Sequence, residues 1–278
     1  MENADVLRIF HSEAAARHGA FRSHRHSAFE ISLIISGHGN YRVGERDFSI
    51  RRGDIFLYHT NEQHCITDIE EDEPMHILNI QFEPRYFWAQ HEQVCFLQTI
   101  FCRSRRGDNR IPADTPLNAE LRAHILAADA ENKTRGVGYE EMIRGHVLAV
   151  LILLTRCESD LPEAPFVDKG RLRDVSRSMD YICAHFRKPV TLAEIAGVAN
   201  LSRAYYCVVF KQLNGITPWE YVNMRRLDAA RQMLRESDET VLSVAMQCGF
   251  NNTANFNRIF RNDTGMTPHA YRAAHPRA

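Results

Sequence analysis

Three histidines and one glutamate in the first quarter of the chain have side chains that bind metals or polar molecules. His24, His26 and Glu30 follow the spacing His-x-His-x3-Glu, and His64 comes after a turn-rich segment. Because side chains alternate along a strand, His24, His26 and Glu30 would share one face, and His64 could join them from a neighbouring strand. Three imidazole nitrogens and one carboxylate suit a borderline transition metal.

The same four side chains could act without a metal. Imidazole and carboxylate groups also hydrogen-bond one another, or line a polar pocket for a small-molecule effector. We expect effector binding as the first role of these residues and a divalent metal as the alternative. No cofactor is therefore expected.

The segments that must position these residues are predicted to be strands, followed by helices. Segments 29–35, 40–50 and 54–59 are rich in β-branched and aromatic residues, and turn residues separate them. Short strands at this spacing are typical of a sandwich or barrel. Segments 117–133 and 139–157 then have helical spacing and length. The second is apolar enough to pack on the barrel or against a partner subunit.

Charge divides the 278-residue chain into two unlike parts, which agrees with a length suited to two domains. Residues 169–278 contain 16 basic and 9 acidic side chains, a net charge of +7. The preceding residues contain 18 basic and 26 acidic side chains, a net charge of −8. The basic part favours a nucleic-acid partner, which the acidic part disfavours.

Cysteine usage and apolar runs indicate where the protein works. Seven cysteines without a CxxC pair disfavour a disulfide framework or a zinc finger and fit a reducing cytosol. The N-terminus has no apolar segment of a signal peptide, and the longest apolar run, 147–154, is too short to span a bilayer. We expect a cytoplasmic protein with no membrane partner.

An internal repeat occupies the C-terminal part. FKQLNGITPWEY at 210–221 aligns with FRNDTGMTPHAY at 260–271, at a constant offset of fifty residues. Upstream, residues 194–206 align with residues 243–256, with one extra residue in the second copy. Two copies of one structural unit are a much stronger signal than either copy alone.

Each copy has the helix-capping and helix-ending residues of a helix-turn-helix. In the first, Thr191 and Glu194 predict a capping box, Ser202 predicts the cap of a second helix, and Gly215 predicts its end. In the second, a helix over 241–248 should stop at Gly249, with Asn251 or Asn252 capping the next. The units lie at about 191–214 and 241–264, joined by a helix over 218–235 that is ~27 Å long.

The second helix of each unit has one apolar face and one polar face. Tyr206, Phe210, Phe256 and Phe260 recur with helical spacing, so we expect them in the core rather than stacked on bases. The opposite faces and their neighbours are the candidates for DNA contact. They are Arg203, Ala204, Cys207, Val208, Lys211 and Arg225, and Asn252, Thr253, Asn255, Asn257, Arg258 and Arg261.

These C-terminal residues resemble the AraC/XylS family of bacterial transcription regulators. The segments that carry the resemblance are 192–234 and 241–272, above all the run GF-x9-FR-x3-GMTP-x2-YR. The N-terminal histidines and glutamate, with Gly37, resemble the motifs of the cupin superfamily, although His59 and Asn61 replace the usual Pro and Gly of the second motif. The expected fold is a multidomain α+β protein: a cupin-like β-barrel with dimerisation-type helices (1–157), a linker (158–170) and an all-α tandem helix-turn-helix domain (171–278).

The family resemblance assigns roles to individual positions. Arg203, Ala204, Cys207 and Val208 match base-facing positions of the first unit, but three of them lack groups for bidentate base contacts. Asn255 and Arg258 match base-facing positions of the second unit, where Asn can pair with adenine and Arg with guanine. Residues expected near phosphates, which give affinity rather than sequence preference, are Arg203, Lys211, Arg225 and Arg261.

The resemblance implies a sequence-specific regulator of transcription with several partners. These are double-stranded DNA, a small-molecule effector for which a carbohydrate is favoured, RNA polymerase and a second copy of the chain. Two alternatives remain: a metal-dependent cupin enzyme with an appended DNA-binding module, and an architectural DNA binder with no effector. No nucleophile elbow, P-loop or dinucleotide fingerprint is present, so we expect no enzyme.

Overall fold

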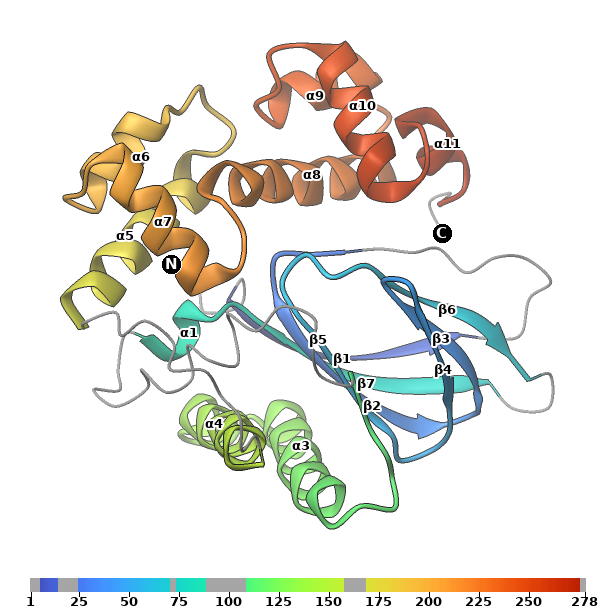
Figure 1. Cartoon of the computed structure of the whole chain (residues 1–278). Coiled ribbons are helices and arrows are strands. Elements are labelled where there is room, and N and C mark those ends of the chain that lie inside the picture. The colour runs from blue at the N-terminus through green and yellow to red at the C-terminus, as the bar shows by residue number, and fades with distance from the viewer. Residues whose placement is uncertain (1–5, 15–24, 71–73, 89–108, 158–168, 276–278) are drawn as a thin grey trace.

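Two antiparallel sheets form the N-terminal domain (Figure 1). The computed structural model describes residues 6–14, 25–70, 74–88, 109–157 and 169–275. The larger sheet has the strand order β1-β7-β2-β5-β8 and the smaller has the order β4-β3-β6. The strands are β1 (Leu7–Ala14), β2 (Phe29–Ser36), β3 (Gly39–Val43), β4 (Arg46–Ile50), β5 (Ile55–Tyr58), β6 (His64–Ile69), β7 (Met75–Phe82) and β8 (Arg110–Ile111).

Strand alternation gives the larger sheet two buried faces with different partners. Ile34, Phe56 and Tyr58 pack with Tyr41 and Val43 of the smaller sheet, in a core between the two sheets. Residues of the opposite face, such as Phe29, Ile31 and Leu33, pack against helices. The strands predicted over 29–35, 40–50 and 54–59 are confirmed, with the middle one divided by the Gly44–Glu45 turn.

Helices α3 (Pro116–Thr134) and α4 (Tyr139–Arg156) cover the outer face of the larger sheet (Figure 1). Thr115 caps α3 and Pro116 opens it, as the preference for Pro at the first helical position predicts. Val147, Val150 and Leu151 of α4 are buried in the same core as the sheet. Burial against the barrel therefore accounts for much of the apolar surface of this helix.

The C-terminal domain contains two helix-turn-helix units on either side of one long helix (Figure 1). Within the described residues the first unit is α6–α7, the second is α9–α10, and α8 joins them. The helices are α5 (Lys169–His185), α6 (Leu192–Val198), α7 (Arg203–Asn214), α8 (Pro218–Glu236), α9 (Val241–Gln247), α10 (Thr253–Thr264) and α11 (Pro268–Ala273); a short helix, α1 (Arg85–Trp88), follows β7. Helix α5 is described from Lys169, and residues 158–168, most of the predicted linker 158–170, lie outside the described residues.

Local capping defines the helix-turn-helix boundaries as predicted. Thr191 and Glu194 form the reciprocal capping box of α6, and Ser202 caps α7. Asn252, rather than Asn251, caps α10 by accepting a hydrogen bond from the Asn255 backbone amide at 3.1 Å. Each cap satisfies a backbone donor that the first turn of a helix leaves unpaired.

Helix α8 belongs to two hydrophobic cores at once. Tyr221 and Val222 pack in the core of the first unit, whereas Leu227 and Leu234 pack in the core of the second. Both cores also contain the ring of Phe186, which follows α5. The two units are therefore fixed to opposite ends of one rigid helix. None of the helices in the described part of the chain is long and apolar enough to cross a membrane.

Gly249 lies where the second unit packs closely against the end of α5. Its φ is +88°, and a Cβ there would lie 2.6 Å from the carbonyl oxygen of Phe186 and 2.9 Å from Nε of Arg226. Gly249→Ala should therefore lower the free energy of unfolding by about 2–5 kcal/mol, since backbone strain adds to overpacking.

Gly265→Ala is the matched control. Gly265 also has a positive φ, +72°, but a Cβ at this position would have no atom within 4 Å. This change should cost only about 1–2 kcal/mol, the backbone contribution alone. Equal losses for the two variants in urea unfolding would show that crowding at Gly249 has no energetic effect.

Candidate effector site and DNA-binding surface

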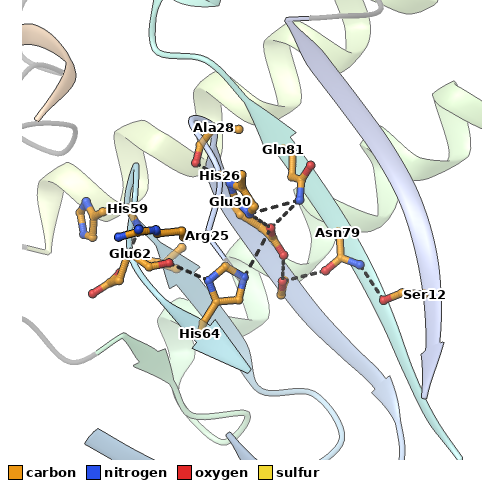
Figure 2. Close-up of polar contacts among 12 residues, drawn as sticks. Ser12, Arg25, His26, Ala28, Glu30, His59, Glu62, His64, Asn79 and Gln81 are labelled. Carbon is orange, nitrogen blue, oxygen red and sulfur yellow. Dashed lines mark hydrogen bonds and ion pairs between the residues drawn. The ribbon is translucent and has the colours of Figure 1, made fainter. Parts of the chain in front are cut away.

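A chain of polar side chains lies on the inner face of the larger sheet (Figure 2). Glu30 on β2 is the register partner of Gln81 on β7, and Gln81 donates to Glu30 Oε2 at 2.6 Å. Two pairs further along, Ser32 Oγ lies 2.8 Å from both Glu30 Oε1 and Asn79 Oδ1. Asn79 in turn donates to Ser12 Oγ on β1 at 2.9 Å. Three neighbouring strands thus contribute to one buried hydrogen-bond network.

Two histidines approach the Glu30 end of this network (Figure 2). His26 Nε2 lies 2.6 Å from Glu30 Oε2, and His26 Nδ1 donates to the Ala28 carbonyl at 3.0 Å. His64 donates through Nδ1 to the Glu62 carbonyl and stacks on the Tyr58 ring, with centroids 4.0 Å apart. The His64 Nε2 is 4.0 Å from Glu30 Oε2. We refer to His26, Glu30, His64 and Gln81 as the lumen cluster.

The structure brings together three of the four residues predicted for this site, but by a different route. His26 precedes β2, which begins at Phe29, and a turn rather than strand alternation aims its ring at Glu30. His64 starts β6 of the smaller sheet, so it faces Glu30 from the opposite sheet and not from a neighbouring strand. His24 lies outside the described residues.

Sequence reasoning missed the polar residues of β7. Asn79 and Gln81 are two residues apart in the strand MHILNIQF, whose other residues are apolar except for His76. That spacing places both side chains on one face of a strand, and polar residues inside an apolar strand signal a buried network.

The predicted DNA-contact residues on α7 and α10 lie on the surface. Arg203, Ala204, Val208 and Lys211 of α7 are exposed, and Cys207 is half-buried. On and beside α10 the exposed residues are Asn252, Asn255, Asn257, Arg258 and Arg261, and Thr253 is half-buried. Arg258 donates to Asn255 Oδ1 at 2.9 Å, which holds these two polar side chains together. The aromatic residues Tyr206, Phe210, Phe256 and Phe260 are buried, as predicted.

Arg225 differs from the expectation of a phosphate contact. Its side chain is only 17% exposed, and one guanidinium nitrogen lies 3.5 Å from Glu83 of the N-terminal domain. Arg225 lies on the face of α8 that lines a cavity between the two domains, as do Asp228 and Arg231. In this arrangement a carboxylate of the chain itself is the partner of Arg225.

Comparison with known proteins agrees with both halves of this architecture. Residues 7–142 match the AraC-like ligand binding domain family, and residues 195–274 match a helix-turn-helix domain family. The chain belongs to the AraC family of transcription regulators.

Relatives of this AraC-family chain cover either most of its length or about a third of it. The HTH-type transcriptional activator RhaS of Citrobacter koseri is 25% identical over 254 residues, which cover 90% of this chain and 86% of that protein. The probable transcriptional regulator LumQ of Photobacterium leiognathi is 38% identical over 92 residues, or 33% of this chain and 37% of that protein.

Among solved structures, ToxT from Vibrio cholerae has the same fold. It aligns with a TM-score of 0.56 at 13% identity, over 96% of this chain and 98% of that chain. A second ToxT structure, from strain SCE256, contains a bound unsaturated fatty acid and aligns with a TM-score of 0.51 at 11% identity, over 98% of this chain and 96% of that chain. This AraC-family chain is accordingly a DNA-binding transcription regulator with an N-terminal effector-binding domain.

Within the lumen cluster of this AraC-family regulator, His26 and Glu30 form a buried pair whose charged forms stabilise each other. Burial alone would lower the pKa of His26, but the hydrogen bond and the charge of Glu30 outweigh it and raise that pKa above its ordinary value. Burial likewise favours the neutral form of Glu30, yet the bond to His26 holds the pKa of Glu30 well below its ordinary value. Both shifts favour the ion pair, in which a protonated His26 donates to Glu30 and to the Ala28 carbonyl.

The lumen cluster also has the chemistry of a metal site. Donor atoms of His26, Glu30 and His64 all lie within 4.8 Å of one another. Two imidazoles and a carboxylate suit a divalent transition metal, which would replace the proton on His26 Nε2. The same side chains can therefore hold either a proton or a cation.

The charged pair predicts a specific dependence of stability on pH. Because the folded-state pKa of His26 is raised, its contribution is complete below pH ~6.5 and is lost as pH rises through the folded-state value. The contribution of Glu30, whose pKa is lowered, is lost only at acidic pH. Glu30→Gln should lower the free energy of unfolding at pH ~6 by about 1–3 kcal/mol and by less at pH ~9.

The matched control is another histidine–glutamate pair, on the surface. His38 Nε2 lies 2.9 Å from Glu70, and the two side chains are 39% and 61% exposed. Glu70→Gln should change stability little at either pH, since exposed ion pairs contribute little. The measurement is urea unfolding of both variants at the two pH values. An effect of Glu30→Gln at pH ~6 that is no larger than its effect at pH ~9 would contradict the predicted stabilisation by the buried pair.

Proposed function

We propose that the second helix-turn-helix unit supplies most of the base recognition of this regulator. Asn255 and Arg258 are exposed, adjacent and chemically suited to adenine and guanine, respectively. In the first unit Ala204, Cys207 and Val208 offer only apolar contacts, of the kind made to thymine methyl groups. Arg203, Lys211 and Arg261 flank these surfaces and supply phosphate contacts, whereas Arg225 is engaged with Glu83 in this arrangement.

We propose a small polar molecule, with a carbohydrate favoured, as the effector. The support is the lumen cluster, because its carboxylate, amide and imidazole groups match a ligand rich in hydroxyl groups. His24, which precedes the described segment, remains a proposed member of this site. A divalent metal held by His26, Glu30 and His64 is the second candidate, supported by the spacing of the donor atoms.

We propose that the regulator acts in the cytoplasm as a homodimer and contacts RNA polymerase. The relative RhaS, which aligns over 90% of this chain, is a transcriptional activator, and this supports the proposed contact with polymerase. We further propose that the chain has no catalytic activity of its own, because its roles as a regulator account for both domains.

The support for a homodimer is a groove on the outer surface of α3 and α4, of about 440 Å³. Ala123, Ala149, Ile152 and Leu153 give it an apolar floor, and Glu120 and Arg156 stand among the lining residues with opposite charges. A two-fold interface uses the same patch on both subunits, so opposite charges beside an apolar strip make the patch self-complementary.

Arg258→Ala tests the proposed base recognition. It should weaken binding to the preferred duplex by about 1–3 kcal/mol and relax the base preference at one position. The measurement is an equilibrium titration of duplexes selected by the protein from a random library. The matched variant is Lys211→Ala, which should weaken binding to selected and random duplexes alike and reduce the salt slope by about one. A uniform loss on all duplexes for Arg258→Ala would contradict direct base readout.

Ile152→Glu tests the proposed dimer surface. A carboxylate in the apolar floor of the groove should shift the protein to monomers in sedimentation equilibrium, because burying an unpaired charge is costly. Ala130→Glu places the same charge on an exposed position of α3 away from the groove and should leave the association unchanged. A wild-type protein that is monomeric at all concentrations would overturn the proposal.

A further inference from the structure

Two histidines face each other across the contact between α3 and α4. The Nδ1 atoms of His124 on α3 and His146 on α4 are 3.2 Å apart, and their ring centroids are 5.5 Å apart. The two helices pack side by side on the outer face of the larger sheet (Figure 1), so the sheet separates these rings from the lumen cluster. We refer to His124 and His146 as the helix histidine pair.

Buried neighbours hold both histidines in place. Leu121 and Ile125 on α3, and Val147 on α4, are buried in the core between the helices and the sheet. Packing of this density leaves the two backbones little freedom to move apart. The histidine rings themselves are only half-buried, so their outer edges remain open to water. The pair is therefore held in position before any ligand arrives, which lowers the entropy cost of binding one.

The separation of the two Nδ1 atoms matches that of two ligands on one metal ion. With metal–nitrogen bonds of ~2.0–2.1 Å and a tetrahedral angle, two ligand nitrogens lie about 3.3–3.4 Å apart. The observed separation is 3.2 Å. Without an ion, one neutral ring donates its Nδ1 proton to the other. With an ion, both rings carry their proton on Nε2 and both Nδ1 lone pairs are available to the metal.

The charge state of the pair favours metal binding. Burial and the charge of His124 lower the pKa of His146, and the opposing effect of Glu131 does not outweigh them. Two imidazolium rings this close together would repel each other. A histidine must be neutral to bind a metal, and the lowered pKa of His146 favours that form at neutral pH.

A groove gives a metal ion access to the pair. His124 lines the groove of about 440 Å³ on the outer surface of α3 and α4. Glu120 is one turn before His124 on the same face of α3 and lines the same groove. Arg156 also lines it and carries the opposite charge, but Glu131 adds a second carboxylate near His146. The local charge around the pair therefore favours a cation.

We propose that the helix histidine pair binds a divalent transition metal ion, with the two Nδ1 atoms as protein ligands and water in the remaining positions. Imidazole ligands suit Zn²⁺, Cu²⁺ and Ni²⁺. The bound ion links α3 to α4, so it has a structural role in the effector domain. This site goes beyond the proposed function, because it requires neither DNA nor an effector. It has two protein ligands where the lumen cluster has three, so we expect it to bind the same ion more weakly.

His146→Gln and His124→Gln test the site in a calorimetric titration with Zn²⁺. The full-length protein is used without a histidine tag, at pH ~7.5, where ordinary histidines are neutral. Each variant should bind one Zn²⁺ ion fewer per chain than the wild type. Loss of a group that only supports a ligand already weakens metal binding about 10–100-fold, so loss of a ligand should remove the site from the titration. Counting the difference keeps the test valid if the lumen cluster also binds Zn²⁺.

His38→Gln is the matched control. It removes another partly exposed imidazole of the same domain, which pairs with Glu70 on the surface. This variant should bind as many Zn²⁺ ions as the wild type. Thermal unfolding without metal establishes that each of the three variants is folded, and either His124→Gln or His146→Gln alone is sufficient for the comparison.

The double variant His124→Gln/His146→Gln tests whether the two rings form one site. Residues that share one ligand are not additive, so the double variant should lose the same single ion as each single variant. A loss of two ions would show two independent surface sites and would overturn the proposal.

Two other results would also overturn the metal site. One is an equal number of bound Zn²⁺ ions in the wild type, His124→Gln and His146→Gln. The other is a loss of one ion in His38→Gln as well, which would show general binding to surface imidazoles. The titrations contain neither DNA nor effector, so failure of the metal site would leave the proposed function unchanged.

Discussion

The whole molecule depends on the constraint that one helix, α8, must satisfy three partners at once. Its apolar residues divide between the cores of the two helix-turn-helix units, Arg225 and Arg231 line the cavity beside the barrel, and the Tyr221 hydroxyl reaches Glu83. A helix that packs against three partners cannot rotate or slide without breaking its packing against at least one of these partners. Helix α8 therefore links both DNA-reading helices to the effector domain, and the Arg25–Asp263 pair adds a direct contact for α10.

Inside the barrel, a buried polar network around Glu30 adjoins the apolar core between the two sheets. Glu30 is buried, and an isolated carboxylate there would be very costly. His26, Gln81 and Ser32 together satisfy it, so each is needed for the others to be tolerated. In a fully satisfied network of this kind the hydrogen bonds strengthen one another, and leaving one member without its partner is costly. This property suits a site that must respond to a ligand.

Local features of the chain could be predicted from the sequence because their physics is local. Thr191, Glu194, Ser202 and Gly249 act on backbone groups within a few residues, and their roles were predicted correctly. The repeat likewise predicted two units of equal design. Which sheet holds His64 depended instead on the pairing of β6 with β3, which the sequence spacing does not specify. Even so, His26, Glu30 and His64 were correctly predicted to lie together.

The interdomain contacts could not be predicted because they join residues far apart in sequence. Arg25 and Asp263 are 238 positions apart, and Glu83 and Tyr221 are 138 apart. No periodicity or motif marks such pairs, and a surface arginine in a basic domain is more simply read as a DNA contact. That reasoning assigned Arg225 to phosphate, whereas its partner in the structure is Glu83.

The two copies of the helix-turn-helix share their helix lengths and caps, but the exposed faces of α7 and α10 differ in chemistry. In the repeat Val208 of α7 aligns with Arg258 of α10 and Cys207 aligns with Asn257, whereas Asn255 aligns with Tyr205. Apolar contacts discriminate weakly between base pairs, whereas bidentate polar contacts discriminate strongly. Regulatory sites in a genome should then diverge unevenly: nucleotides under α7 accumulate substitutions over generations, while those under α10 are retained. A logo built from such sites would be lopsided, with most of its information at one end.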